Sequence, residues 1–201
     1  MRTTEGKPAI SRTHSGDPEL AGKLSDALAA VEFEDRYTNR FHTYPAGIHP
    51  DTVRDLLALF PARSLLDPFC GGGTVLVEGR VAGLATTGLD LSPTAIRVSR
   101  LRASTPPDDL LTAMRSTARR LTEAARKADE MPPERILKAV REWYADCALV
   151  ELESLRKGVR AADPPVRELI EGVLSLILVK VSWRKSDTSA RRERHRRPPG
   201  T

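Results

Sequence analysis

The sequence predicts an α/β fold in its first half and a mainly α-helical region after it. Two short apolar runs, 64–66 and 85–91, alternate with stretches of helical pattern, and a turn follows each run. Three consecutive glycines, 71–73, lie between the first run and the next helical stretch. After residue 107, apolar residues recur only at helical spacing. This order is typical of one strand–helix–strand unit with parallel strands, followed by the start of a second unit.

The elements of the first half follow one another closely. A weak helical patch covers 19–31, and a helix is expected to begin at His49-Pro50 and to end before Pro61. The later elements are a buried strand at 64–66 that ends at Asp67, a helix over 74–82, a strand over 85–91 and a helix over 92–102. Gly83 is expected to close the helix that starts at Thr74.

The second half reads as three helical runs. Apolar residues recur at helical spacing over 110–125 and again over 136–155. A third helix is expected from Asp163-Pro164-Pro165, with Asp163 as its cap and Pro164 in the first turn. The sequence thus predicts four segments: a polar segment 1–40, an α/β part 41–105, a helical region 106–183 and a tail 184–201.

Composition excludes several classes of protein. A hydrophobic share of 40% is too high for a disordered chain, and 13 glycines are too few for a collagen. Two cysteines, Cys70 and Cys147, cannot form a disulfide scaffold. The longest apolar stretch, 173–181, is interrupted by Ser175 and Lys180 and is too short to span a membrane. No targeting segment is visible, so a cytoplasmic location without membrane contact is the expectation.

The net charge of +5 lies in one segment. Residues 184–197 hold seven basic and two acidic residues, so the rest of the chain balances at 25 of each sign. This Arg-rich tail is expected to be disordered and to contact nucleic-acid phosphates without specificity.

The residues around the glycines carry the chemistry. Asp67 ends the first strand, and glycines at the following turn let the backbone approach a ligand closely. Asp90 follows the second strand, 23 residues after Asp67, near the spacing at which an acidic residue meets a ribose hydroxyl. No Lys follows the glycines, which excludes a Walker phosphate loop. The pattern indicates a cleft for a nucleoside-bearing ligand with a positive centre.

The string Asp67-Pro68-Phe69-Cys70-Gly71-Gly72-Gly73-Thr74 resembles the S-adenosylmethionine motif of class I methyltransferases. It is most similar to the group of N4/N6 DNA methylases and N2-guanine tRNA methylases, whose typical string is Asp-Pro-Phe-x-Gly-x-Gly-Thr. Residues 41–50 also resemble the segment that these families place before the motif. The resemblance implies S-adenosylmethionine as cofactor, a nucleic acid as partner (DNA rather than RNA) and a partial Rossmann-like sheet.

The same resemblance implies roles for individual residues. Asp67 would meet the amino group of the methionine moiety, and Asp90 would bind the ribose hydroxyls. Tyr44, with Pro45 and Ile48, would close the pocket, whereas Cys70 reads as packing beside the loop. The residues expected at the cofactor are Asp67, Pro68, Phe69, Cys70, Gly71, Gly73, Thr74, Asp90, Leu91 and Tyr44. His42 and His49 are expected to be structural, and no set of metal ligands is found.

A second motif of this group, Asp/Asn/Ser-Pro-Pro followed by an aromatic residue, is not found. The nearest string, Asp163-Pro164-Pro165-Val166, ends in a residue that cannot stack on a base. No catalytic residue is therefore assigned. The sequence predicts two strands, whereas the resemblance implies a sheet of seven. The remaining strands are therefore expected on a continuation of the chain or on a second chain.

These observations leave three hypotheses. The leading one is the cofactor-binding N-terminal part of an S-adenosylmethionine-dependent DNA amino-methyltransferase. The first alternative is a truncated or split fragment without catalytic activity that acts as a binding module. The second is part of a tRNA guanine-N2 methyltransferase.

Overall fold

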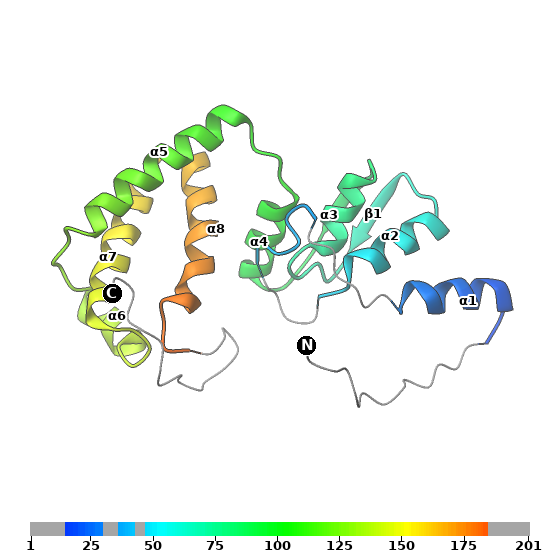
Figure 1. Cartoon of the computed structure of the whole chain (residues 1–201), viewed down its shortest axis with the longest axis horizontal. Coiled ribbons are helices and arrows are strands. Elements are labelled where there is room, and N and C mark those ends of the chain that lie inside the picture. Colours follow the sequence, from blue (N-terminus) through cyan, green and yellow to red (C-terminus); the bar gives the residue numbers. More distant parts are fainter. Residues whose placement is uncertain (1–14, 30–35, 43–46, 185–201) are drawn as a thin grey trace, which may run out of the picture. The chain divides into compact units, whose positions relative to one another are not determined.

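The computed structural model describes residues 15–29, 36–42 and 47–184 (Figure 1). The chain divides into two compact units, 1–103 and 104–201, which are described separately.

The first unit contains a small parallel sheet and its helices. Its elements are α1 (Pro18–Ala27), α2 (Pro50–Leu59), β1 (Ser64–Asp67), α3 (Thr74–Val81), β2 (Ala85–Gly88) and α4 (Pro93–Ala103). β1 and β2 pair in parallel, from Ser64 opposite Ala85 to Asp67 opposite Gly88. α3 is the crossover between them, so the strand–helix–strand unit and the helix after it are present as predicted.

Local chemistry explains where these helices begin and end. His49 is the N-cap of α2, where its Nδ1 accepts a hydrogen bond from the Asp51 N–H at 3.2 Å, and Pro50 takes the first helical position. Gly83 follows α3 with a φ of 79°, a left-handed conformation that glycine adopts without steric cost. The predicted ends of both helices are therefore correct to within a residue or two.

The prediction that the first strand is buried was wrong. Leu66 in β1 is 61% exposed, and no residue of β1 is fully buried. Within the described residues, β1 has one neighbouring strand, β2, so a two-stranded sheet leaves apolar side chains uncovered. The second strand also ends at Gly88 rather than at residue 91, and Phe60 at the end of α2 is exposed.

α3 packs closely on the sheet because of a glycine. A Cβ at Gly79 would lie 2.8 Å from the Cγ2 of Thr86 and 3.1 Å from the Cδ2 of Leu65. The side chains of Thr86 and Leu65 therefore lie directly against the backbone of α3 at this position. Leu76 and Val77 on α3 and Ala95 and Val98 on α4 are buried and form much of this unit's apolar core.

The second unit is a helical assembly. Its elements are α5 (Asp108–Ala125), α6 (Glu134–Val140), α7 (Asp146–Arg160) and α8 (Pro164–Lys180). A core cluster of Leu121, Val159, Val166 and Ile170 joins α5, α7 and α8. Gly158 on α7 lies against the Leu121 side chain, so α5 and α7 are in intimate contact.

The structure corrects two further expectations. The helical pattern over 136–155 belongs to two helices, α6 and α7, because the chain leaves helical geometry around Trp143, whose carbonyl accepts a hydrogen bond from the Trp183 N–H at 2.7 Å. Asp163 is the N-cap of α8, as predicted by position, but its side chain makes no capping hydrogen bond. Among the described residues, no helix has the length and apolar character needed to cross a membrane.

Candidate functional site

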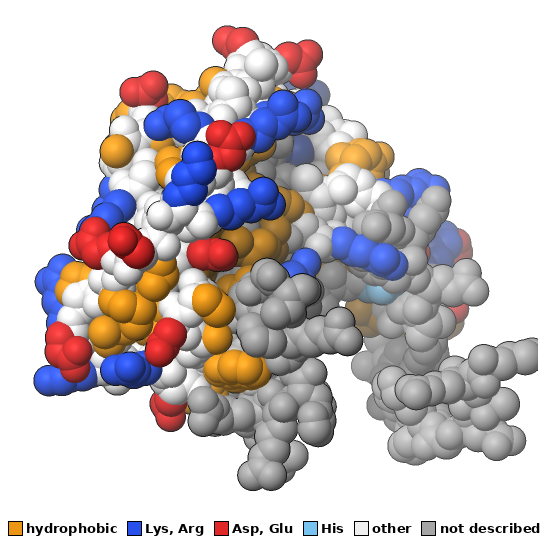
Figure 2. Space-filling view, turned by 60° about the vertical axis from the view of Figure 1, so that its left-hand side comes forward, with side chains coloured by type: hydrophobic (Ala, Val, Ile, Leu, Met, Phe, Trp, Pro, Cys, Tyr) orange, Lys and Arg blue, Asp and Glu red, His pale blue; other side chains and the backbone are white. Residues whose placement is uncertain are grey.

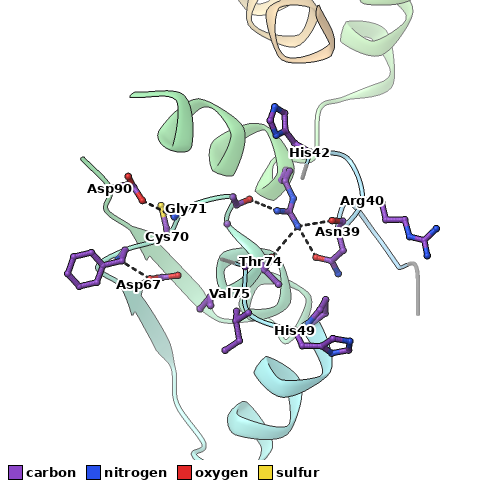
Figure 3. Close-up of a pocket in the computed structure, with 17 residues that line it drawn as sticks. Asn39, Arg40, His42, His49, Asp67, Cys70, Gly71, Thr74, Val75 and Asp90 are labelled. Atoms are coloured by element: carbon purple, nitrogen blue, oxygen red, sulfur yellow. Dashed lines mark hydrogen bonds between the residues drawn. The ribbon is translucent and has the colours of Figure 1, made fainter. Parts of the chain in front are cut away.

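A cavity of about 940 Å³ opens at the carboxyl end of β1 (Figure 3). The loop between β1 and α3 forms one wall, and chain segments at 39–42 and 47–50 form another. The lining residues are Asn39, Arg40, His42, Gly47, Ile48, His49, Pro50, Asp67, Phe69, Cys70, Gly71, Gly72, Gly73, Thr74, Val75, Asp90 and Arg102. Parallel sheets place ligand sites at the carboxyl ends of their strands, so the cavity lies where a ligand site is expected.

Two carboxylates hold the loops at the strand ends. Asp67 accepts a hydrogen bond from the Phe69 N–H through Oδ1 at 3.0 Å. Asp90 accepts from the Gly71 N–H through Oδ2 at 2.9 Å and from the Ser92 N–H through Oδ1 at 2.8 Å. Among the described residues no donor reaches Oδ2 of Asp67, which leaves one oxygen of that carboxylate for a ligand.

Gly73 is required both by its backbone and by its neighbour. It has a φ of 81° and stands at the N-cap of α3. A Cβ there would lie 2.7 Å from the Cβ of Ser99 and 2.8 Å from its Cα, closer than real Cβ contacts. α4 therefore supports the glycine loop from behind. Thr74 and Val75 at the start of α3 line the cavity, and N–H groups at a helix start favour negative or polar ligand atoms.

Cys70 is the loop residue whose side chain packs against α4 and β2. It is buried, and its Sγ is 3.6 Å from Ser99 Oγ. A Cβ at Gly88 would lie 3.0 Å from the Cβ of Cys70, so β2 also packs on this side chain. These contacts agree with the expectation that Cys70 packs beside the loop.

Arg102 ties the loop to the segment before α2. The residue is only 4% exposed, and its guanidinium donates through Nη1 to the Gly72 carbonyl at 2.6 Å. Nε donates to the Thr38 carbonyl at 3.0 Å. Nη2 donates to Asn39 Oδ1 at 3.0 Å (Figure 3). In return, the Thr38 hydroxyl donates to the Arg102 carbonyl at 2.8 Å. One side chain of α4 thus holds two walls of the cavity together.

Glu78 completes this buried network. It is 1% exposed, and its Oε1 accepts from Asn39 Nδ2 at 2.7 Å while Arg54 Nε lies 3.1 Å from its Oε2. Burial lowers the pKa of Arg102, and the negative charge of Glu78 acts in the opposite direction. Asn39 is the neutral bridge between the two charges. Such groups are stable in an interior only when they are paired and hydrogen-bonded.

The structure brings most of the predicted cofactor residues to one cavity. Its lining includes Asp67, Phe69, Cys70, Gly71, Gly73, Thr74 and Asp90. Pro68 and Leu91 are not among the lining residues, and Leu91 is 99% exposed. Tyr44 and Pro45 lie outside the described residues.

Sequence reasoning missed Asn39, Glu78 and Arg102. A signal for Arg102 was present, because it shares a helical face with the buried Ala95, Val98 and Ser99. No comparable signal marks Asn39, whose partners lie 39 and 63 residues away. In the described part of the chain, no cluster of three His, Cys, Asp or Glu side chains suits a metal ion.

Comparison with known proteins found a relative that matches part of this chain. An alignment over 72 residues, which covers 33% of this chain, is 35% identical to the Type II methyltransferase M.MvaI of Kocuria varians. The chain covers 16% of the length of that relative. No family model matches the sequence, and no solved structure matches it. The chain is thus similar to a methyltransferase along one third of its length.

Proposed function

We propose that the 36–103 region binds S-adenosylmethionine and that the chain is part of a methyltransferase acting on an amino group of a nucleic-acid base, with DNA as the favoured substrate. The observation that carries this proposal is the paired carboxylates, Asp67 and Asp90, on either side of a glycine loop. The similarity to a Type II methyltransferase supports the same reading.

The cavity suits this cofactor. Its volume of about 940 Å³ lies within the range of about 300–1,000 Å³ usual for small-molecule sites. The unoccupied oxygen of Asp67 is chemically suited to an ammonium group. Each oxygen of Asp90 already accepts one backbone hydrogen bond and retains a lone pair for a ribose hydroxyl. The exposed ring of Phe69 offers an apolar surface at the rim.

When bound, S-adenosylmethionine supplies its methyl group to the attacking amine. The residues of this chain contribute binding and orientation. Asp67 and Asp90 fix opposite ends of the cofactor, and the Arg102 network keeps the glycine loop in one conformation before binding. Preorganisation of this kind removes an entropic cost from the bound complex.

A chain that binds but does not catalyse is the second candidate. The nearest match to a Pro-Pro-aromatic motif is the start of α8, where Val166 is buried in the helical core. It therefore offers no ring to a flipped base. β1 also keeps one edge without a strand in the described structure, and we propose that a further strand, from a second chain or another stretch of protein, pairs there.

Transfer of a labelled methyl group distinguishes the two candidates. Purified chain is incubated with methyl-labelled S-adenosylmethionine and either DNA or tRNA, and label in the nucleic acid is counted. Label in DNA that is lost in Asp67→Asn supports the methyltransferase. Cofactor binding without transfer to either substrate supports the binding-only candidate, and label in tRNA alone supports the RNA reading.

A further inference from the structure

The exposed face of α5 carries an excess of positive charge. Residues 108–127, which are α5 and the two residues after it, hold five basic and three acidic residues, a net charge of +2, and two of the acidic residues, Asp108 and Asp109, lie in the first turn. All five are exposed, and we call them the α5 cationic face: Arg115, Arg119, Arg120, Arg126 and Lys127. In Figure 2, Lys and Arg side chains lie over the upper part of the helical unit, where α5 runs, with Asp and Glu side chains among them.

The described structure forms no ion pair between these cations and the acids of the same helix, Asp108, Asp109 and Glu123. Within the part of the chain that the structure describes, none of the five is in an ion pair. On α7, by contrast, Arg156 lies 2.6 Å from Glu153 and Lys157 lies 2.6 Å from Glu130. A helix that only needed solubility would interleave both signs, as 134–146 does with three basic and three acidic residues.

Three of the arginines are aligned. Arg115, Arg119 and Arg126 follow one another at spacings of four and seven residues, which places them along one line of the helix. The line is about 16 Å long, a length over which one DNA strand advances about five phosphates. The helix dipole favours cations at Arg126 and Lys127 near the C-terminus of α5, but it does not explain Arg115 and Arg119 in the middle.

The helix is also a rigid support. Leu121 and Ala125 on its opposite side are buried, and Leu121 contacts Gly158 of α7. Because the apolar side of α5 is committed to the core, the helix cannot insert it into a membrane as a surface-bound amphipathic helix does. Four of the five cations are arginines, whose planar fork fits phosphate oxygens.

We propose that the α5 cationic face binds the phosphate backbone of nucleic acid. Arg115, Arg119 and Arg126 contact phosphates without reading sequence, and Arg120 and Lys127 add attraction at the side of the line. The choice of nucleic acid as partner rests on the proposed function, but the surface itself does not depend on the cofactor site. It would position a substrate rather than select one.

Binding of a short fluorescent DNA duplex to the full-length chain tests this, without cofactor, between about 50 and about 200 mM salt. The triple variant Arg115→Gln, Arg119→Gln, Arg126→Gln is compared with the matched triple Arg135→Gln, Lys138→Gln, Arg141→Gln on and after α6. Both remove three exposed positive charges from one unit. The first should weaken binding at least about tenfold at the lower salt and reduce the salt slope by about 2 to 3, at about 0.9 per lost contact.

The control triple should bind as the wild type does. Equal weakening in both triples, or no change in the first, would overturn the proposal, as would a wild-type chain that does not bind the duplex. Anionic phosphatidylserine vesicles and polyglutamate are the competing probes. A loss in the first triple that is seen with either of these but not with DNA also overturns it. Since no cofactor is present, a failure of S-adenosylmethionine binding leaves these outcomes unaffected.

Discussion

The two compact units place their charges in opposite ways. In the 1–103 unit, Arg102 and Glu78 are buried beside the glycine loop and joined through Asn39. In the 104–201 unit, the core cluster is apolar, Glu153 on α7 is buried in an ion pair with Arg156 of the same helix, and the cations of α5 lie outside the core. Burying charge costs desolvation, so a chain retains it where it fixes a conformation, whereas exposed charge remains free to meet a partner. The first unit is therefore built to hold a loop, and the second to present a surface.

Removal of the buried cation, Arg102, is expected to have the largest effect on the contrast between the two units. Arg102→Met should cost about 3–5 kcal/mol in the unfolding free energy of the first unit, because the Gly72 and Thr38 carbonyls and Asn39 Oδ1 lose their donor. Denaturant unfolding measures this, and faster amide exchange over 69–76 reports loss of the loop. Arg100→Met, an exposed position on the same helix, is the control and should leave both unchanged. Equal unfolding free energies and equal exchange rates in the two variants would show that the Arg102 network does not stabilise the loop.

A methyl group at Gly73 is expected to have the next largest effect. Gly73→Ala should cost about 2–4 kcal/mol, from a left-handed backbone and from contact with the Cα and Cβ of Ser99. Gly83→Ala is a matched control, since Gly83 has a φ of 79° but nothing within 4 Å of its Cβ position. It should cost about 1–2 kcal/mol. Thermal unfolding that ranks the two variants equally would contradict tight support of the loop by α4.

Among the described residues of the second unit, one carboxylate, Glu153, is buried, and its contribution to stability should depend on pH. Hydrogen bonds from Arg156 hold the pKa of Glu153 below its ordinary value of 4.5, although burial acts in the opposite direction. The folded state therefore binds the proton more weakly than the unfolded state. The resulting stability is complete above about pH 4.5 and is lost as the pH falls through the lower, folded value.

Acid unfolding followed by circular dichroism tests this sign. Glu153→Gln should lower stability at neutral pH and flatten its decline in acid. Glu151→Gln, on the same helix and without an ion pair among the described residues, should reproduce the wild-type curve. If both variants lost stability in acid to the same extent as the wild type, Glu153 would not be the group responsible for this pH dependence.

The smallest effect is expected at the rim of the cavity. Phe69 is 83% exposed, so Phe69→Ala should leave stability unchanged while weakening S-adenosylmethionine about threefold to tenfold through lost apolar contact. Leu91→Ala changes an exposed residue that does not line the cavity and should alter neither. Calorimetric titration separates the variants. A stronger effect from Leu91 than from Phe69 would support the sequence-based expectation that Leu91 meets the cofactor.

Local signals predicted more of this molecule than distant ones. The turn at 71–73, the helix after it and the start of α8 at Asp163-Pro164 follow from glycine and proline chemistry within a few residues. The break between α6 and α7 escaped prediction because apolar spacing continues through it and Trp183 bonds to Trp143 from 40 residues away. Burial of Leu66 was overestimated because an apolar run does not reveal how many strands surround it.

The site shows the same limit. Asp67, Gly71 and Asp90 stood out because their residue types and spacing carry chemistry within one strand–helix–strand unit. Asn39 and Glu78 join segments that only the tertiary fold brings together. An asparagine near the N-terminus and a glutamate in a helix have too many ordinary roles for sequence to single them out.

Calorimetric titration with S-adenosylmethionine, wild type beside Asp67→Asn, tests the central claim most directly. The amide keeps an oxygen for the Phe69 N–H but removes the charge, whereas Asp90→Ala would also release the Gly71 and Ser92 N–H groups. Binding by the wild type, with about 10-fold to 100-fold weaker affinity in Asp67→Asn, is the predicted result. No heat of binding in the wild type, or equal affinity in both proteins, would contradict the assignment of this cavity to that cofactor.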